Sequence, residues 1–223
     1  MENIVFNDVW GLEIAVEMTL LAIASFSAVL AFISYLEGRV RDAVMGGLVA
    51  TVLPIASLVI LTLHLLKPEA AYLVFASVQP RAWMHWGATG ITLLLVLSAI
   101  FTLLARIGSW RTATIAVGAL ASLAGLFVAL YTGLVLAYER GIPFWHSAAI
   151  PLIALTMGAV GGLSAYAIIR PGDTRVTVSL SVALLVLLIA YLAHLHLSLV
   201  GPIAASYSAQ AAISSVEFII GIV

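Results

Sequence analysis

The chain has 223 residues, of which 64% are hydrophobic and only 9% are charged, whereas soluble domains carry about 25% charged residues. This composition excludes a soluble globular protein and predicts one membrane-embedded domain over residues 1–223. The net charge of −1 does not point to nucleic acid as a partner. The absence of cysteine excludes disulfides, iron–sulfur clusters held by thiolates and covalent c-type haem in this chain.

Clusters of charged residues divide the chain into six apolar stretches, each long enough to cross a hydrocarbon core of about 30 Å as a helix. The predicted spans are 10–36, 43–66, 82–105, 112–137, 145–169 and 176–200. The segment 203–223 begins polar and ends in the apolar letters FIIGIV, which indicate the start of another span. The predicted fold is an all-α membrane protein, a bundle of about six transmembrane helices plus the start of a seventh.

Basic residues divide unevenly between the two ends of this bundle. Lys67, Arg81 and Arg140 flank the spans at one end. The other end holds six arginines: Arg39, Arg41, Arg106, Arg111, Arg170 and Arg175. Because positive residues stay on the cytoplasmic side of a membrane, we expect a multi-pass protein of the cell membrane with its N terminus outside.

Histidine and tryptophan side chains gather at the predicted outer end. An aromatic belt explains any single tryptophan, and an interfacial hydrogen bond explains any single histidine. Their accumulation at one end instead favours a shared polar pocket or a docking face. The set comprises Trp10, Trp83, Trp86 and Trp145, together with His64, His85, His146, His194 and His196.

The first predicted span carries two acids, Glu13 and Glu17, one turn apart on one helix face. With Trp10 at the interface, Glu17 lies about 10 Å deep. An ionised acid near the bilayer centre costs about 2.5–3.5 kcal/mol, so such residues are functional candidates. Two neighbouring carboxyl groups can also share a proton. The alternative is a structural pair that hydrogen-bonds to neighbouring helices, with Glu13 reaching outward.

The segment YTGLVLAYERGIPFWHS, residues 131–147, joins the fourth and fifth spans. A turn between spans requires polar residues, but it does not require a tyrosine or a histidine such as Tyr131 and His146. Tyr131 lies about 30 Å above Arg111, at the outer end of its span. A carbonyl head group requires a hydroxyl donor, a proton carrier and aromatic walls. Tyr131 and the two glutamates supply the first two, and the walls would come from Trp10 and Trp86. His64 and His146 are secondary candidates for a proton relay or for contact with another subunit.

Three stretches resemble the polysulfide-reductase membrane subunits, the NrfD-like family. YTGLVLAYERGIPFWHSAAIPL is similar to that family's Tyr-x-Gly helix end, Pro-aromatic-Trp turn and Leu-Pro helix. LHLLKPEAAYLVFASVQPRAWMHWGATG resembles its loop with a His/Asp-Leu-Gly-Arg-Pro motif followed by Ser-Trp-x-x-Trp-Gly. WGLEIAVEMTLLAIASFSA is similar to its first helix. The resemblance covers most of residues 10–200.

This resemblance implies a membrane anchor that exchanges electrons with a quinone, menaquinone or similar, near the outer surface. It also implies an iron–sulfur electron-transfer subunit docked there and a catalytic subunit of molybdopterin/iron–sulfur type. The implied quinone site lies between Glu13, Glu17 and Tyr131. The chain departs from the family in two ways: the family's first polar pair is more often an amide and an imidazole, and the family has eight spans.

Three alternatives remain open from the sequence. A b-type haem anchor would draw one histidine pair from the outer end, although we expect neither haem nor an iron–sulfur cluster in this chain and no metal site. A small-cation transporter would use the glutamates and histidines, and it would require a polar path to the inner face. A pure anchor without quinone would leave Glu13 and Tyr131 dispensable.

Overall fold

The computed structural model of the chain describes residues 12–64, 69, 72–73, 83–138 and 142–214. This part of the chain forms seven helices and no strand, and six of the helices are long and apolar enough to cross a membrane. The prediction of an all-α membrane protein with about six spans is confirmed. The helices are α1 (Leu12–Leu36), α2 (Val40–His64), α4 (Trp83–Ile107), α5 (Arg111–Tyr138), α6 (Ala149–Ile169), α7 (Thr174–Leu199) and α8 (Ile203–Ile213).

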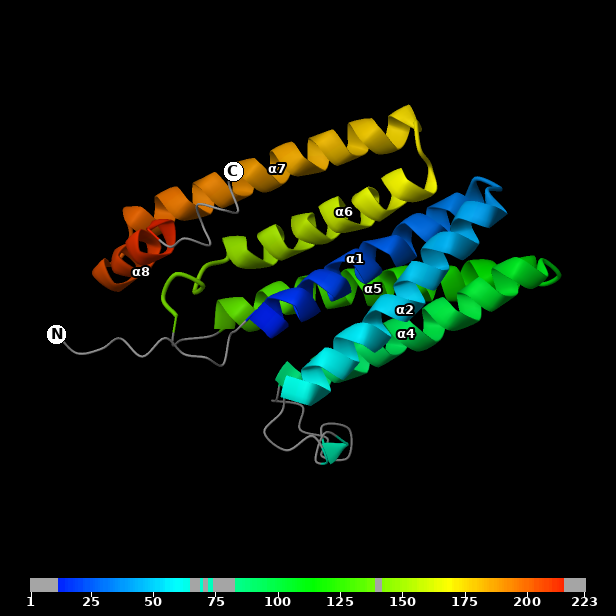
Figure 1. Cartoon of the computed structure of the whole chain (residues 1–223), viewed down its shortest axis with the longest axis horizontal. Helices are drawn as coiled ribbons and strands as arrows, with labels where there is room; N and C mark the ends of the chain where they lie inside the picture. Colours follow the sequence, from blue (N-terminus) through cyan, green and yellow to red (C-terminus); the bar gives the residue numbers. More distant parts are fainter. Residues whose placement is uncertain (1–11, 65–68, 70–71, 74–82, 139–141, 215–223) are drawn as a thin grey trace.

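Three short turns at one end of the bundle each contain a glycine with positive φ. Gly38, Gly108 and Gly172 have φ angles of 77°, 76° and 81°, in a left-handed region that glycine adopts without steric cost. These turns reverse the chain between successive spans, and the six arginines flank them. We call this the arginine end, on the right of Figure 1. The opposite end carries Trp83, Trp86 and Trp145 and is called the tryptophan end.

The central helix of the bundle is α1, which packs against α2, α5 and α6. Its buried face consists largely of small residues: Ala24, Ser25, Ser27, Ala28 and Ala31. Small residues allow close approach of helix backbones in lipid, where close packing replaces the hydrophobic effect as the driving force for association. Because α1 is surrounded in this way, an acid near its start can face protein instead of lipid.

The turn before α6 is longer than the sequence predicts. The predicted span begins at Trp145, whereas α6 begins at Ala149. The Trp145 amide donates to the Ile142 carbonyl at 2.9 Å, so Trp145 belongs to a tight turn. The Ser147 hydroxyl then accepts from the Ala149 amide at 3.2 Å, just where the helix starts. Apolar side chains within a turn are the reason that hydropathy placed the boundary too early.

A polar network joins two turns at the arginine end. Arg170 donates from Nε to Asp42 Oδ2 at 2.8 Å and from Nη2 to Ser34 Oγ at 2.7 Å. Its Nη1 lies 3.6 Å from Glu37 and 3.7 Å from Asp173. The Arg170 side chain is only 11% exposed, so its charge depends on these partners. The network fastens the α1–α2 turn to the α6–α7 turn.

Asp173 forms a second link between the same turns. Arg39 Nη1 donates to Asp173 Oδ2 at 2.9 Å, and this hydrogen bond lowers the pKa of the Asp173 carboxyl below its ordinary value. The other oxygen of Asp173 accepts from the Arg175 amide at 2.9 Å and caps the start of α7. One carboxylate therefore both starts α7 and holds it to the α1–α2 turn.

Candidate functional site

Glu17 is a buried acid in the half of α1 nearest the tryptophan end, with 6% of its surface exposed. The Ser57 hydroxyl on α2 donates a hydrogen bond of 3.0 Å to Glu17 Oε1. Ser57 itself is fully buried. Glu13, one turn earlier, is exposed. The two glutamates lie on neighbouring parts of one face, as their spacing predicts, but α2 covers only the second of them.

Tyr131 lies on α5 and is half-buried. It lies within electrostatic range of Glu17 on α1. Its ring packs against Phe127 at a centroid distance of 6.1 Å and against Trp83 of α4 at 6.4 Å. No other described residue hydrogen-bonds to the Tyr131 hydroxyl, so this donor is available to a bound molecule.

Gly87 of α4 provides the space for Tyr131. A Cβ atom at this position would collide with the ring and the hydroxyl of Tyr131. A similar close approach occurs at Gly133, where an added Cβ would lie 2.5 Å from Pro151 Cα of α6. Gly87 therefore allows α4 to pack closely against the Tyr131 ring. Gly133 allows α6 to pack closely against α5, the helix that carries Tyr131.

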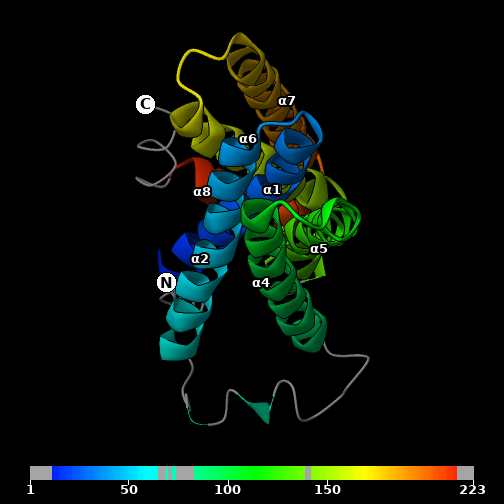
Figure 2. The ribbon, with the colours of Figure 1, turned by 90° about the vertical axis from the view of Figure 1, so that its right-hand side faces the viewer.

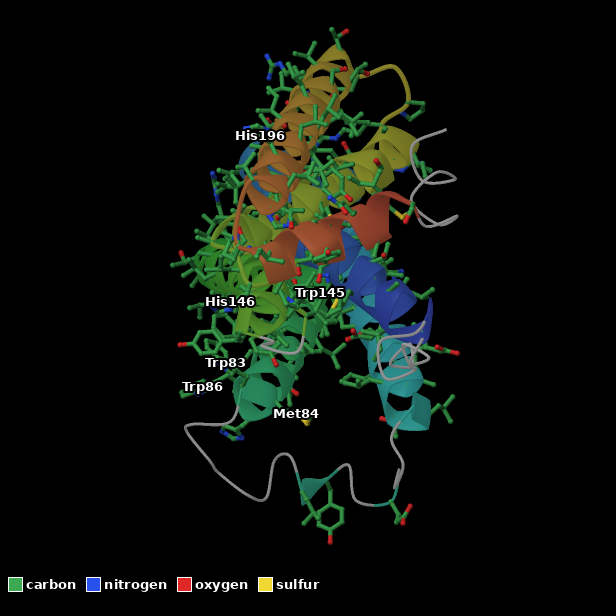
Figure 3. The ribbon with its side chains drawn as sticks, turned by 90° about the vertical axis from the view of Figure 1, so that its left-hand side faces the viewer. Trp83, Met84, Trp86, Trp145, His146 and His196 are labelled. Atoms are coloured by element: carbon green, nitrogen blue, oxygen red, sulfur yellow. The ribbon has the colours of Figure 1, made fainter. Side chains whose placement is uncertain are left out.

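Aromatic side chains cover this site toward the end of the bundle. Trp83, at the first residue of α4, also packs against Tyr138 at 5.0 Å. Trp86 is 46% exposed and makes an edge-to-face pair with His85 at 5.9 Å. Figure 3 looks onto the tryptophan end, where Trp83 and Trp86 come into view together. Trp83 is therefore a tryptophan that packs beside Tyr131, whereas the sequence favoured Trp10 and Trp86 as the aromatic walls.

The α5–α6 turn brings further polar groups to the same end. His146 is exposed, and its Nδ1 lies 2.9 Å from the Ala137 carbonyl of α5. Phe144 packs against the His194 ring of α7 at 4.7 Å. His194 is fully buried. The Phe144 backbone approaches its imidazole, but neither ring nitrogen has a partner with hydrogen-bond geometry among the described residues. His146 is visible at this end in Figure 3, and His196 lies farther along α7.

An apolar groove of about 330 Å³ opens on the side of the bundle between α2 and α4. Figure 2 shows these two helices diverging toward the tryptophan end. Leu58 lines the groove and also packs against the buried core, and it follows Ser57 directly in the sequence. The groove is lined by Ile55, Leu58, Val59, Thr62, Leu63 and Leu95.

The structure thus separates the residues that the sequence grouped. It places buried Glu17 and half-buried Tyr131 on two packed helices within electrostatic range of each other, and it leaves Glu13, Trp86 and His146 at the surface. Trp10 lies outside the described residues, as does the side chain of His64, the last residue of α2. Sequence reasoning missed Ser57 and Gly87 as parts of the site. Gly87 had a signal, because it ends the Trp-x-x-Trp-Gly motif, whereas one serine in an apolar helix has none.

Among the described residues, no three histidine, aspartate or glutamate side chains gather as a metal site. His85 packs against Trp86, and His146 lies beside the Ala137 carbonyl. His194 packs against Phe144. The chemistry available at Glu17 and Tyr131 is hydrogen bonding and proton exchange.

The chain matches the family described as "Polysulphide reductase, NrfD" over residues 2–223. The chain belongs to the NrfD family. Members of this family are membrane subunits of respiratory oxidoreductase complexes. A comparison with curated proteins finds no match. The NrfD match spans every helix described above, and it includes the three stretches whose motifs resemble this family.

Proposed function

We propose that this chain is the membrane anchor and quinone-reactive subunit of a multi-subunit respiratory oxidoreductase. The quinone head group binds between Glu17 and Tyr131. One observation carries this proposal: a buried acid on α1 and a half-buried tyrosine on the neighbouring helix α5 lie within electrostatic range of each other. Intramembrane acids mark functional sites by default, and the family supplies the redox context.

The two residues suit the two requirements of a quinone head group. Reduction of a quinone to a quinol takes up two electrons and two protons, and the reverse reaction releases them. The Tyr131 hydroxyl donates a hydrogen bond to a head-group carbonyl and stabilises the charge that develops on that oxygen. The Glu17 carboxyl exchanges a proton at its second oxygen, Oε2, because Oε1 accepts from Ser57. Trp83 and Phe127 flank the tyrosine.

The apolar groove between α2 and α4 fits the isoprenoid tail of the same molecule. Menaquinone and similar quinones carry long apolar tails that stay in the hydrocarbon region. The groove faces the membrane at the half of α2 that holds Ser57 and is almost entirely apolar. A tail in this groove would lie against α2, the helix whose Ser57 hydrogen-bonds to Glu17.

The partner surface is the tryptophan end. An iron–sulfur subunit docks there and exchanges electrons with the quinone, and a catalytic subunit of molybdopterin/iron–sulfur type completes the complex. His146, exposed in the α5–α6 turn, and Trp86, exposed at the start of α4, are available for this contact. The excess of arginine at the opposite end favours an orientation in which the tryptophan end and the N terminus face the outer side of the cell membrane.

Photolabelling of the purified complex tests the site. A quinone analogue with a photoreactive group on its head should label α1 near Glu17 and α5 near Tyr131. Excess unlabelled quinone should suppress both labels. Labelling confined to α7 or α8, or labelling that resists competition, would contradict the proposal.

A further inference from the structure

The Ser57 hydroxyl differs from the neighbouring threonine hydroxyls of α2 in the acceptor of its hydrogen bond. Thr51 and Thr62 donate to backbone carbonyls four residues earlier on their own helix, both at 2.7 Å. This is the usual arrangement for a hydroxyl inside a transmembrane helix. Ser57 instead donates across to Glu17 Oε1 of α1 at 3.0 Å. Both partners are buried, so water does not compete for this bond.

A hydroxyl group has one proton to donate, and this one fixes a particular carboxyl oxygen. Oε1 is held as an acceptor by Ser57, which leaves Oε2 as the oxygen that can carry and release a proton. The same bond restricts rotation of a long side chain that would otherwise adopt several rotamers. No other hydrogen bond to the Glu17 side chain comes from the described residues.

We propose that Ser57 is a positioning residue that orients the Glu17 carboxyl group for proton exchange at Oε2. This inference rests on the proposed function and deepens it. Ser57 does not touch the quinone. It acts through Glu17, by setting which oxygen faces the head group and by holding it there.

The test compares Ser57→Ala with two further variants in the assembled complex. Ser57→Ala removes the donor, and quinone turnover should fall about tenfold, which corresponds to about 1.4 kcal/mol. Ser57→Thr retains the hydroxyl and should restore most of the lost rate. Ser25→Ala is the matched control, because Ser25 is equally buried on α1 but its hydroxyl has no partner among the described residues. It should turn over quinone like the parent.

Infrared difference spectroscopy supplies a readout that does not depend on turnover. The carboxyl band of Glu17 is identified by its loss in Glu17→Gln. In Ser57→Ala this band should shift, because Oε1 loses its hydrogen bond, whereas in Ser25→Ala it should stay in place. Should Ser57→Ala fail to assemble, Ser57→Cys keeps the approximate volume with a weaker donor and takes its place.

The outcomes separate the two claims. Parent-like turnover in Ser57→Ala, or an unshifted Glu17 band, overturns the positioning role. If at the same time Glu17→Gln is slow, the proposed quinone site survives and only Ser57 is wrong. If Glu17→Gln turns over at the parent rate, the proposed function fails and the positioning role fails with it.

Discussion

Tyr131 of α5 rests on Gly87 of α4, at a point where any larger residue would collide with the tyrosine ring and hydroxyl. Gly87 ends the Trp-x-x-Trp-Gly motif and Tyr131 begins the Tyr-x-Gly motif, so two motifs far apart in the sequence meet at one contact. The glycine is required by the tyrosine, and the tyrosine is placed beside Trp83 by the same packing. This contact sets where the hydroxyl donor stands relative to Glu17.

The two glutamates of α1 should differ in their importance. Glu17 is buried and held by Ser57, whereas Glu13 is exposed. Glu17→Gln keeps the shape and removes proton exchange, so quinone turnover should fall by about 10²–10⁴, the usual contribution of a general acid or base. Glu13→Gln is the matched control and should stay near the parent rate. Equal losses in steady-state turnover of the two variants would argue against a single proton-exchanging acid.

Filling the groove between α2 and α4 should weaken binding of long-tailed quinones. Val59 lines the groove and is 53% exposed, and Val52 is 55% exposed, two turns away and outside the groove. Val59→Trp should raise the KM for a long-tailed quinone about tenfold, equivalent to about 1.4 kcal/mol, and should leave a short-tailed analogue unaffected. Val52→Trp should change neither. An equal effect of Val59→Trp on both substrates would show that the groove does not hold the tail.

The Arg39–Asp173 pair should stabilise the protein in a pH-dependent way. The pKa of Asp173 is lower in the folded protein than its ordinary value near 3.8, because Arg39 hydrogen-bonds to the carboxylate. The stabilisation is therefore fully present above that ordinary value and is lost as the pH falls through the lower folded pKa. Arg39→Gln should lower the melting temperature at neutral pH, and its difference from the parent should shrink in strong acid. Arg41→Gln, at an exposed arginine two residues away, is the control. A difference for Arg39→Gln that stays constant down to strong acid would contradict this origin.

Much of the fold could be predicted from the sequence because the membrane imposes strong rules on it. A helix that crosses the hydrocarbon region must satisfy its own backbone hydrogen bonds, so apolar stretches between charged clusters are sufficient to locate six spans. The start of α6 was missed because Trp145 and its neighbours in the turn are apolar enough to extend a hydropathy window. Only the hydrogen bonds of the turn, such as that from the Trp145 amide to Ile142, distinguish it from a helix.

The candidate site was less predictable, since its parts come from four helices. Helical spacing placed Glu13 and Glu17 on one face, but burial of Glu17 alone depends on where α2 crosses α1. Ser57 carries no signal in the sequence, because buried serines such as Ser25 and Ser98 elsewhere in the bundle have no partner among the described residues. The choice of Trp83 over Trp86 follows from which face of α4 meets α5, and this is a property of packing.

The orientation of the chain in the membrane can be tested with introduced cysteines, because the natural sequence contains none. The excess of arginine at one end predicts that Gly172→Cys is reached by a membrane-impermeant thiol reagent only from the cytoplasmic side. Glu139→Cys, between α5 and α6, should be reached only from outside. Labelling of both from the same side of sealed vesicles would contradict the predicted topology.

The central claim is that the Tyr131 hydroxyl donates a hydrogen bond to the quinone head group, and one pair of variants tests it most directly. Tyr131→Phe removes the hydroxyl and keeps the ring between Trp83 and Phe127. Tyr138→Phe makes the same change on the same helix, at a residue that also packs against Trp83 but is exposed. The measurement is the quinone turnover of the assembled complex, alongside the partner's activity with an artificial electron carrier. We expect Tyr131→Phe to lose about 10²–10³ in quinone turnover, Tyr138→Phe to match the parent, and the artificial-carrier activity to survive in both. Parent-like quinone turnover in Tyr131→Phe would contradict the account.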